Sequence, residues 1–123
     1  VNALCAAHSV RVPLQCEFFA LEGLSQLMRT IASVQGGLNR QLTMQGIVLT
    51  MYDGRNKLSE QVANDARPHL GDLVYNTVIP RNVRISEAPS FGQPVLIYDL
   101  NCAGSKAYIA LAAELLEQEK EAA

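Results

Sequence analysis

The sequence lacks several features that would assign it to a common protein class. It contains no tryptophan, and its three cysteines, Cys5, Cys16 and Cys102, form no CxxC pair. Separated cysteines in odd number are typical of small buried thiols in a reducing compartment, not of a disulfide framework. The two histidines, His8 and His69, have no second ligand at metal-binding spacing. We therefore expect no metal site and no disulfide.

Membrane and catalytic signatures are missing as well. No apolar run approaches twenty residues, and no signal peptide is recognisable. Neither histidine has an arguable partner for a Ser-His-Asp set. A P-loop requires a glycine-rich segment ending in Gly-Lys-Ser/Thr, and "AGSK" at 103–106 lacks that spacing and order. The residues alone therefore indicate no catalytic site.

Length and composition favour one compact domain over residues 1–123, because 49% of the residues are hydrophobic. The net charge of −2 does not indicate a nucleic-acid-binding protein. The charge is unevenly distributed, however, with acidic residues gathered in the tail from 114 onward. Five basic residues lie between positions 55 and 84: Arg55, Lys57, Arg67, Arg81 and Arg84.

The spacing of apolar residues predicts strands that alternate with helices. Strands are expected at 9–15, 44–52 and 73–80, and helices at 19–35, 56–67, 82–88 and 105–120. Asn56 and Asn82 are candidate N-caps, and Pro68 is expected to end its helix by about Arg67. The last helix is expected to bury a face of Tyr108, Leu111, Ala112 and Leu115. This order predicts an α/β fold with a mostly parallel sheet.

The segment "IPRN" at 79–82 is a candidate binding loop, because ligands of open parallel sheets lie beyond the carboxyl ends of the strands. Pro80 has no amide hydrogen and a fixed φ, so it is suited to ending a strand. Asn82 offers a donor and an acceptor to a nucleobase edge, or it caps the helix that follows. From spacing alone the capping role is the more common, and the two roles are compatible.

Arginines flank this loop. Arg81 and Arg84 are three residues apart and could share a face of the short helix, where two guanidiniums suit phosphate oxygens. Arg55 follows the turn signal Asp53-Gly54. Ordinary surface arginines are the more frequent explanation of such a pattern, and spacing does not separate the two.

Three long strings, "VPLQCEFFALEGLSQLMRTI", "GIVLTMYDGRNKLSEQV" and "TVIPRNVRISEAPSFGQPVLIYD", give the sequence a specific resemblance. In this order and spacing they resemble the C-terminal half of the ParA/Soj chromosome- and plasmid-partitioning ATPases. The resemblance implies part of a doubly wound P-loop NTPase fold without its N-terminal P-loop half. It also implies ATP and Mg²⁺ as cofactors of the whole protein, a nucleotide-dependent dimer, nonspecific DNA binding and a ParB-type partner. The expected location is cytoplasmic, on the nucleoid.

When the family's residues are matched by position, the resemblance implies that Pro80 and Asn82 lie beside the adenine of the nucleotide. It gives Arg55 and Arg84, with Arg81 nearby, contacts to the DNA backbone. The family's P-loop and water-handling aspartate would lie upstream of Val1, so we expect this chain alone to hydrolyse no ATP and to bind it negligibly. The open edge of the strand at 9–15 is expected to favour self-association.

Two other functions remain open. A related MinD-like class attaches to membranes through a basic amphipathic C-terminal helix, whereas the tail here is the acidic "LLEQEKEAA". We therefore expect no membrane attachment. The other alternative is a noncatalytic structural or regulatory remnant of the same fold. The sequence upstream of Val1 would distinguish this remnant from an ATPase.

Overall fold

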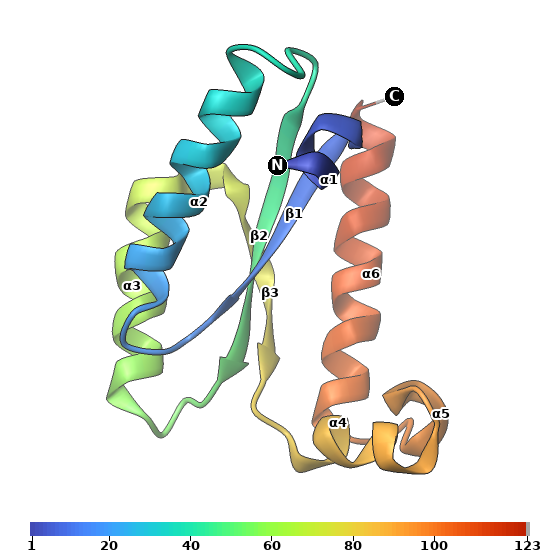
Figure 1. The fold of residues 1–123 in the computed structure, drawn as a ribbon. Coiled ribbons are helices and arrows are strands. Elements are labelled where there is room, and N and C mark those ends of the chain that lie inside the picture. Colours follow the sequence, from blue (N-terminus) through green and yellow to red (C-terminus); the bar gives the residue numbers. More distant parts are fainter. Residues whose placement is uncertain (123) are drawn as a thin grey trace.

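The computed structural model describes residues 1–122 and contains a three-stranded parallel sheet between two layers of helices (Figure 1). The strand order is β1-β2-β3, so that β2 lies in the centre. Helices α2 and α3 cover one face, and the long helix α6 lies on the other (Figure 1). The strands are β1 (Ser9–Gln15), β2 (Thr43–Tyr52) and β3 (Val74–Pro80). The sequence-based prediction of an α/β fold with a parallel sheet is confirmed.

The main core lies between the sheet and the pair α2 (Ala20–Gln35) and α3 (Lys57–Leu70). In β1 the inward positions alternate, and Val12 and Leu14 are buried while their neighbours are exposed. Ile47 and Leu49 of the central strand are completely buried. Burial of about eight such side chains, at roughly 1.5–3 kcal/mol each, is the main force that holds the helices to the sheet.

The end of α3 differs from the prediction, because the helix continues through Pro68 to Leu70. Proline costs the helix one hydrogen bond, but its fixed φ is itself helical, and the loss falls in the last turn. Tertiary packing outweighs this cost, since Ala66 is fully buried and Leu70 packs against the core. The helix ends at Gly71, whose φ of 54° is readily adopted only by glycine.

The C-terminal helix α6 (Ala103–Ala122) was placed correctly in the sequence, but its buried face was only partly predicted. Leu111 and Leu115 are half-buried, whereas Tyr108 and Ala112 are exposed. The side facing the sheet instead includes Glu114 and Gln118, whose polar groups bind the strands. Because α6 packs along β3, a different face of the helix is buried from the one that the apolar spacing predicted.

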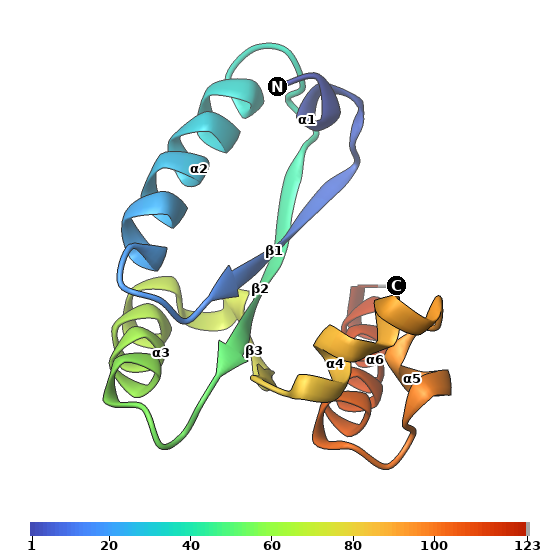
Figure 2. The ribbon, with the colours of Figure 1, turned by 60° about the horizontal axis from the view of Figure 1, so that its bottom comes forward.

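Several short elements were not predicted, because each has too few residues to show a period. They comprise α1 (Asn2–Ala6), α5 (Val95–Tyr98) and two 3₁₀ turns, Gly71–Leu73 and Ala88–Phe91. The predicted short helix is present as α4 (Val83–Glu87), and it ends before Pro89 as expected. With α5 and the start of α6 it forms a small helical group at one end of the molecule (Figure 2).

The two edges of the sheet differ in how they are closed. Cys16 donates its amide hydrogen to the Thr50 carbonyl of β2. Because backbone amides alternate in direction along a strand, the amides of Leu14 and Val12 also point toward β2, whereas the backbone nitrogen of Pro13 faces the open edge. At the other edge, the Glu114 carboxylate accepts the amides of Asn76 and Thr77 at 2.7 and 2.9 Å. A charged acceptor thus occupies the outer side of β3.

The thiol prediction holds for one cysteine, since Cys16 is buried while Cys5 and Cys102 are only half-buried. All three are free thiols. Over residues 1–122 no group of three His, Cys, Asp or Glu side chains is placed to hold a metal ion. No helix in the same range combines the length and apolarity that crossing a membrane requires.

Candidate functional site

The candidate site lies where the three parallel strands end. β3 ends at Pro80, as predicted, and Pro80 is paired with Tyr52 at the end of β2. The amide of Arg81 donates to the Tyr52 carbonyl at 2.8 Å and so fixes the chain immediately after the proline. The loops that follow the strands therefore begin side by side, as expected for a ligand-binding edge.

Asn82 performs the capping role that its spacing suggested. Its Oδ1 accepts the amide hydrogen of Arg84 at 2.8 Å, and its extended backbone precedes α4. The same residue lines a cavity of about 420 Å³ at the strand ends. Because the cap uses only Oδ1, the carboxamide still has its Nδ2 hydrogens to donate. One side chain thus caps α4, lines the cavity and keeps an amide group that the cap does not use.

The walls of this cavity come from all three strands, from the segment that follows β3 and from α6. Gln15 ends β1, Thr50 and Met51 lie near the end of β2, and Tyr108 comes from α6. Tyr108 is 39% exposed, which explains why it does not contribute to the packed face of α6. Met51 has a φ of 55°, a backbone conformation that is uncommon for a residue with a side chain. Such outliers concentrate at functional sites.

Arg84 is bound to acidic neighbours instead of standing free. Its guanidinium lies 3.2 Å from Glu87 and 3.5 Å from Asp99, and the Tyr98 hydroxyl donates to Glu87 at 2.8 Å. The hydrogen bond with Tyr98 and the charge of Glu87 raise the pKa of Arg84 above its usual value. Arg84 therefore joins α4 to α5, and its charge is partly compensated.

The two other arginines have different surroundings. Arg81 precedes the cap of α4, so the prediction that it shares a helical face with Arg84 is wrong. The chain extends through Asn82 between them, which the three-residue spacing did not reveal. Arg55 is almost fully exposed, with 94% of its side chain accessible. The backbone hydrogen bond from Arg55 lowers the pKa of Asp53, its partner in the turn.

Sequence reasoning missed the residues that support the loop from a distance. Tyr98 and Asp99 reach Arg84 only because α5 folds back against α4. Gly104, in the first turn of α6, would place a Cβ 2.6 Å from the Ile85 side chain and 3.7 Å from the Asn82 Cβ. A glycine directly before the helix predicted at 105–120 was the available signal for this close approach.

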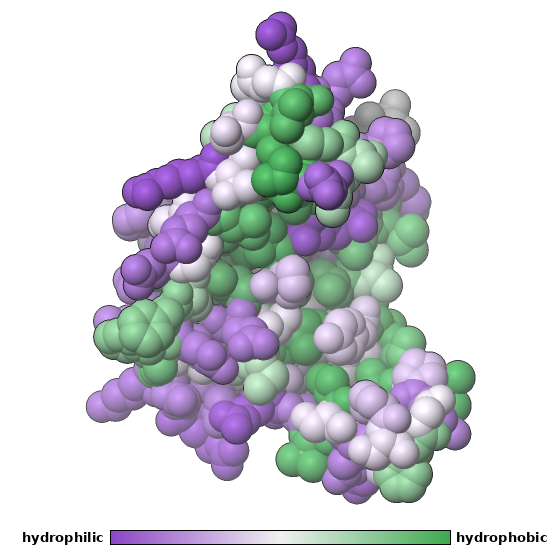
Figure 3. Space-filling view, in the orientation of Figure 1, coloured by the Kyte–Doolittle hydropathy of each residue, from purple (hydrophilic) through white to green (hydrophobic). Residues whose placement is uncertain are grey.

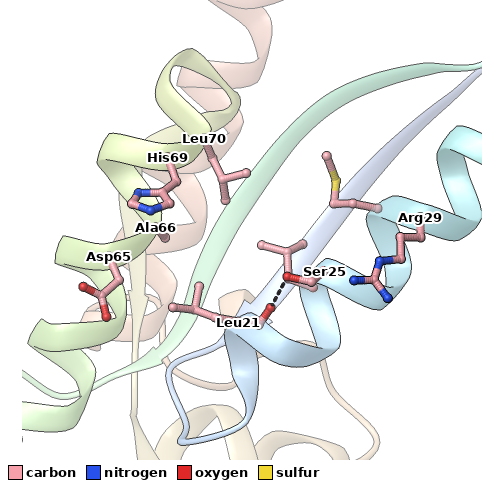
Figure 4. Close-up of a pocket in the computed structure, with 9 residues that line it drawn as sticks. Leu21, Ser25, Arg29, Asp65, Ala66, His69 and Leu70 are labelled. Atoms are coloured by element: carbon pink, nitrogen blue, oxygen red, sulfur yellow. Dashed lines mark hydrogen bonds between the residues drawn. The ribbon is translucent and has the colours of Figure 1, made fainter.

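A larger cavity, of about 640 Å³, lies between α2 and α3 (Figure 4). Leu21, Ala66 and Leu70 line it, and Arg29, Asp65 and His69 stand along its rim. None of the predicted site residues lies there. We assign the candidate site to the smaller cavity, because strand ends and the loop at 79–82 converge on it.

Comparison with known proteins adds independent evidence. Residues 4–95 match the family model described as CobQ/CobB/MinD/ParA nucleotide binding domain. Over 121 residues the chain is 69% identical to the chromosome partitioning protein ParA of Caulobacter vibrioides, covering 98% of this chain and 45% of that protein. It is 50% identical over 119 residues to the chromosome-partitioning ATPase Soj of Treponema pallidum, covering 97% of this chain and 47% of that protein. The chain thus spans less than half the length of these curated relatives.

A solved structure shows the same fold. Cobyrinic acid a,c-diamide synthase from Mycobacterium smegmatis, crystallised with ADP and magnesium, is 34% identical to this chain with a TM-score of 0.71. The likeness covers 99% of this chain and 42% of the synthase chain. The three-stranded sheet and its helices therefore correspond to a portion of a nucleotide-binding fold.

Proposed function

The chain belongs to the CobQ/CobB/MinD/ParA nucleotide-binding domain family, and on this basis we propose that it is the C-terminal part of a ParA/Soj-type ATPase that partitions chromosomes or plasmids. Its relatives at 69% and 50% identity are chromosome-partitioning proteins. The observation that carries the proposal is the loop at 79–82. Pro80 ends β3 there, and Asn82 lines the cavity at the strand ends.

The described residues suit the base side of a nucleotide. Asn82 keeps its Nδ2 donor for a ring nitrogen or carbonyl, and Pro80 and Met51 supply apolar surface beside it. The donor set does not fit Mg²⁺, because no carboxylate lines the cavity, and no group of three His, Cys, Asp or Glu side chains in residues 1–122 is placed to hold a metal. Residues outside this chain would hold the phosphates and Mg²⁺, so no hydrolytic step is assigned to it.

DNA contacts are proposed for Arg55, Arg81 and Arg84. Arg55 is the best placed, because its guanidinium extends into solvent from a turn. Nonspecific binding needs phosphate contacts and no base readout, so a local group of arginines suffices even in a chain with a net charge of −2. A ParB-type partner, nucleotide-dependent dimerisation and a cytoplasmic, nucleoid-associated location complete the proposed function.

A chimaera tests the nucleotide role. This chain would replace the 121 matching residues of the Caulobacter ParA, which differ at about three positions in ten. We expect the chimaera to bind ATP and support partitioning. Asn82→Asp keeps the capping oxygen but loses the amide donor. It should weaken ATP binding roughly tenfold, as expected for loss of a hydrogen bond that leaves a buried polar group unpaired.

Asn56 supplies a matched control, because its side chain caps α3 through the amide of Leu58 at 2.9 Å and does not line the cavity. Asn56→Asp should change ATP affinity by less than about twofold, since a carboxylate also caps helices well. Equal effects of the two substitutions would remove Asn82 from the base site. A chimaera that folds and binds no ATP at all would reject the proposed function.

DNA retention by the same chimaera tests the arginines. Arg55→Ala should lower affinity for unrelated DNA sequences equally and reduce the slope of log affinity against log salt by about one. Arg29→Ala, in α2 beside the larger cavity, is the control with the same charge change. An unchanged slope for Arg55→Ala would exclude a phosphate contact at this residue.

A further inference from the structure

Helix α6 has an apolar stripe on the side that faces away from the sheet. Ile109 and Leu116 are 49% and 64% exposed and lie two turns apart, with Ala112 and Ala113 between them. The opposite side of the helix, with Glu114 and Gln118, binds the strands. In the space-filling view, apolar side chains reach the surface over α6 and the adjoining α5 (Figure 3). We call these four residues the α6 stripe.

The α6 stripe is complementary to itself when two helices lie antiparallel. A two-fold axis between Ala112 and Ala113 places Ile109 of one helix against Leu116 of the other, and the reverse contact follows by symmetry. The two alanines at the axis let the helix backbones approach closely, as small residues do at tight helix contacts. Every large side chain in the α6 stripe thereby meets a large side chain of the second helix.

The charges beside the stripe match the same arrangement. Lys106 and Glu117 lie on one flank of α6, about three turns apart, and both are exposed. In antiparallel pairs the same flanks of two helices meet, so Lys106 approaches Glu117 of the second copy. Glu117 already lies 3.5 Å from Lys120 of its own chain, but that pair is largely exposed and weak. Opposite charges therefore meet twice across the axis.

The edges of the sheet are poorer surfaces for such a contact. Glu114 occupies the outer amides of Asn76 and Thr77 on β3. Pro13 offers no amide at the open edge of β1. Strand pairing between copies is thus blocked at one edge and interrupted at the other, whereas the α6 stripe lies open along the helix.

We propose that a second copy of this chain docks on the α6 stripe, antiparallel and about a two-fold axis at Ala112 and Ala113. Four side chains per helix, even with the neighbouring exposed residues of α5, bury less than the roughly 800 Å² per partner of a standard interface. The dimer is accordingly weak and forms in the micromolar to millimolar range. It does not use the strand-end cavity and needs no nucleotide.

Sedimentation equilibrium of the 123-residue chain tests the contact. We expect a monomer–dimer equilibrium, and Leu116→Glu should raise the dissociation constant roughly tenfold or more by placing a charge against Ile109 of the second copy. The control is Leu38→Glu, which makes the same change at a leucine that is 72% exposed in the turn after α2. It should alter the constant less than about twofold, and circular dichroism would verify that both variants fold.

Exchange of the charges gives a second, more specific measurement. Lys106→Glu and Glu117→Lys should each weaken the dimer, and combining them should restore it, because the pair is recreated with reversed signs. A monomer at every attainable concentration would overturn the proposal. So would self-association that Leu116→Glu leaves unchanged, or a double exchange that shows no rescue.

Discussion

Replacing Glu114 by alanine would remove the acceptor that holds the outer side of β3. Its carboxylate accepts three hydrogen bonds, from the amide of Asn76 at 2.7 Å and from the amide and hydroxyl of Thr77 at 2.9 and 2.7 Å. Two consecutive strand amides usually point in opposite directions, and here both reach one side chain. The pairing register of β3 with β2 shifts in the same stretch, between the partners of Ile47 and Leu49. Glu114 therefore stabilises the irregular stretch of β3 where the register shifts.

The expected loss follows from the number and kind of these bonds. A hydrogen bond to a charged group contributes about 1.5–3 kcal/mol, but water can replace part of the carboxylate at the exposed amide of Asn76. We expect Glu114→Ala to lower the free energy of unfolding by about 2–4 kcal/mol, measured by urea denaturation. Glu114→Gln keeps one acceptor oxygen and should lower it by about half as much.

The stabilisation of the fold by the Glu114 carboxylate depends on pH. Burial alone would raise the pKa of Glu114, but the hydrogen bonds from Thr77 and Asn76 and the charge of Arg67 lower it overall. A lowered pKa in the folded state means that the ionised form stabilises the fold. This stability is complete above the unfolded-state pKa, near 4.3, and is lost as the pH falls through the folded-state value. The difference between wild type and Glu114→Gln should therefore shrink in acid.

Glu117→Ala is the matched control, one turn along the same helix, because its only ionic partner among the described residues is the exposed Lys120. Its free energy of unfolding should stay within about 0.5 kcal/mol of the wild-type value. If Glu114→Ala and Glu117→Ala were equally stable, the Glu114 carboxylate would not stabilise the irregular stretch of β3.

Three further changes give separate outcomes. Gly104→Ala should lower the melting temperature by several degrees, because the new methyl group meets the Ile85 side chain at 2.6 Å; an unchanged melting curve would contradict that contact. Cys102 should react with iodoacetamide before Cys16 at neutral pH. Burial raises the pKa of Cys16, whereas hydrogen bonds with Ser105 outweigh burial and lower the pKa of Cys102. Mass spectrometry of partly labelled protein would show the opposite order if this is wrong. Pro68→Ala should raise the free energy of unfolding by about 1 kcal/mol by restoring an amide donor in the last turn of α3; a loss of stability in urea would instead favour a packing role for the proline ring.

The parts of the fold that the sequence predicted are those governed by neighbouring residues. The buried strand around Ile47 and Leu49, the cap at Asn56 and the strand end at Pro80 each follow from a few adjacent side chains. The face of α6 does not, because it depends on the free amides of β3 about forty residues earlier. Polar residues of α6 face the sheet there, because the free amides of a strand edge need hydrogen-bond acceptors, which apolar side chains cannot supply.

The candidate site shows the same division. Asn82 was recognised as a cap from its place between a strand-ending proline and a short helix, and the structure confirms the cap. The ion pairs of Arg84 were not foreseen, because Asp99 lies fifteen residues further along and reaches it through α5. The unusual φ of Met51 leaves no trace in the sequence, and it coincides with the irregular pairing of β2 with β3 between Leu49 and Tyr52.

Pro13 has a consequence for any strand that joins the sheet beside β1. A parallel newcomer would normally receive amide hydrogens from alternate residues of β1, and Pro13 stands at one of these positions without a hydrogen to give. One carbonyl oxygen of the newcomer would then face the proline ring with no backbone donor. It must be satisfied by water or by a side chain, which leaves a gap in the ladder at a residue that lines the strand-end cavity. A docked strand would therefore be held least firmly beside the site that it helps to enclose.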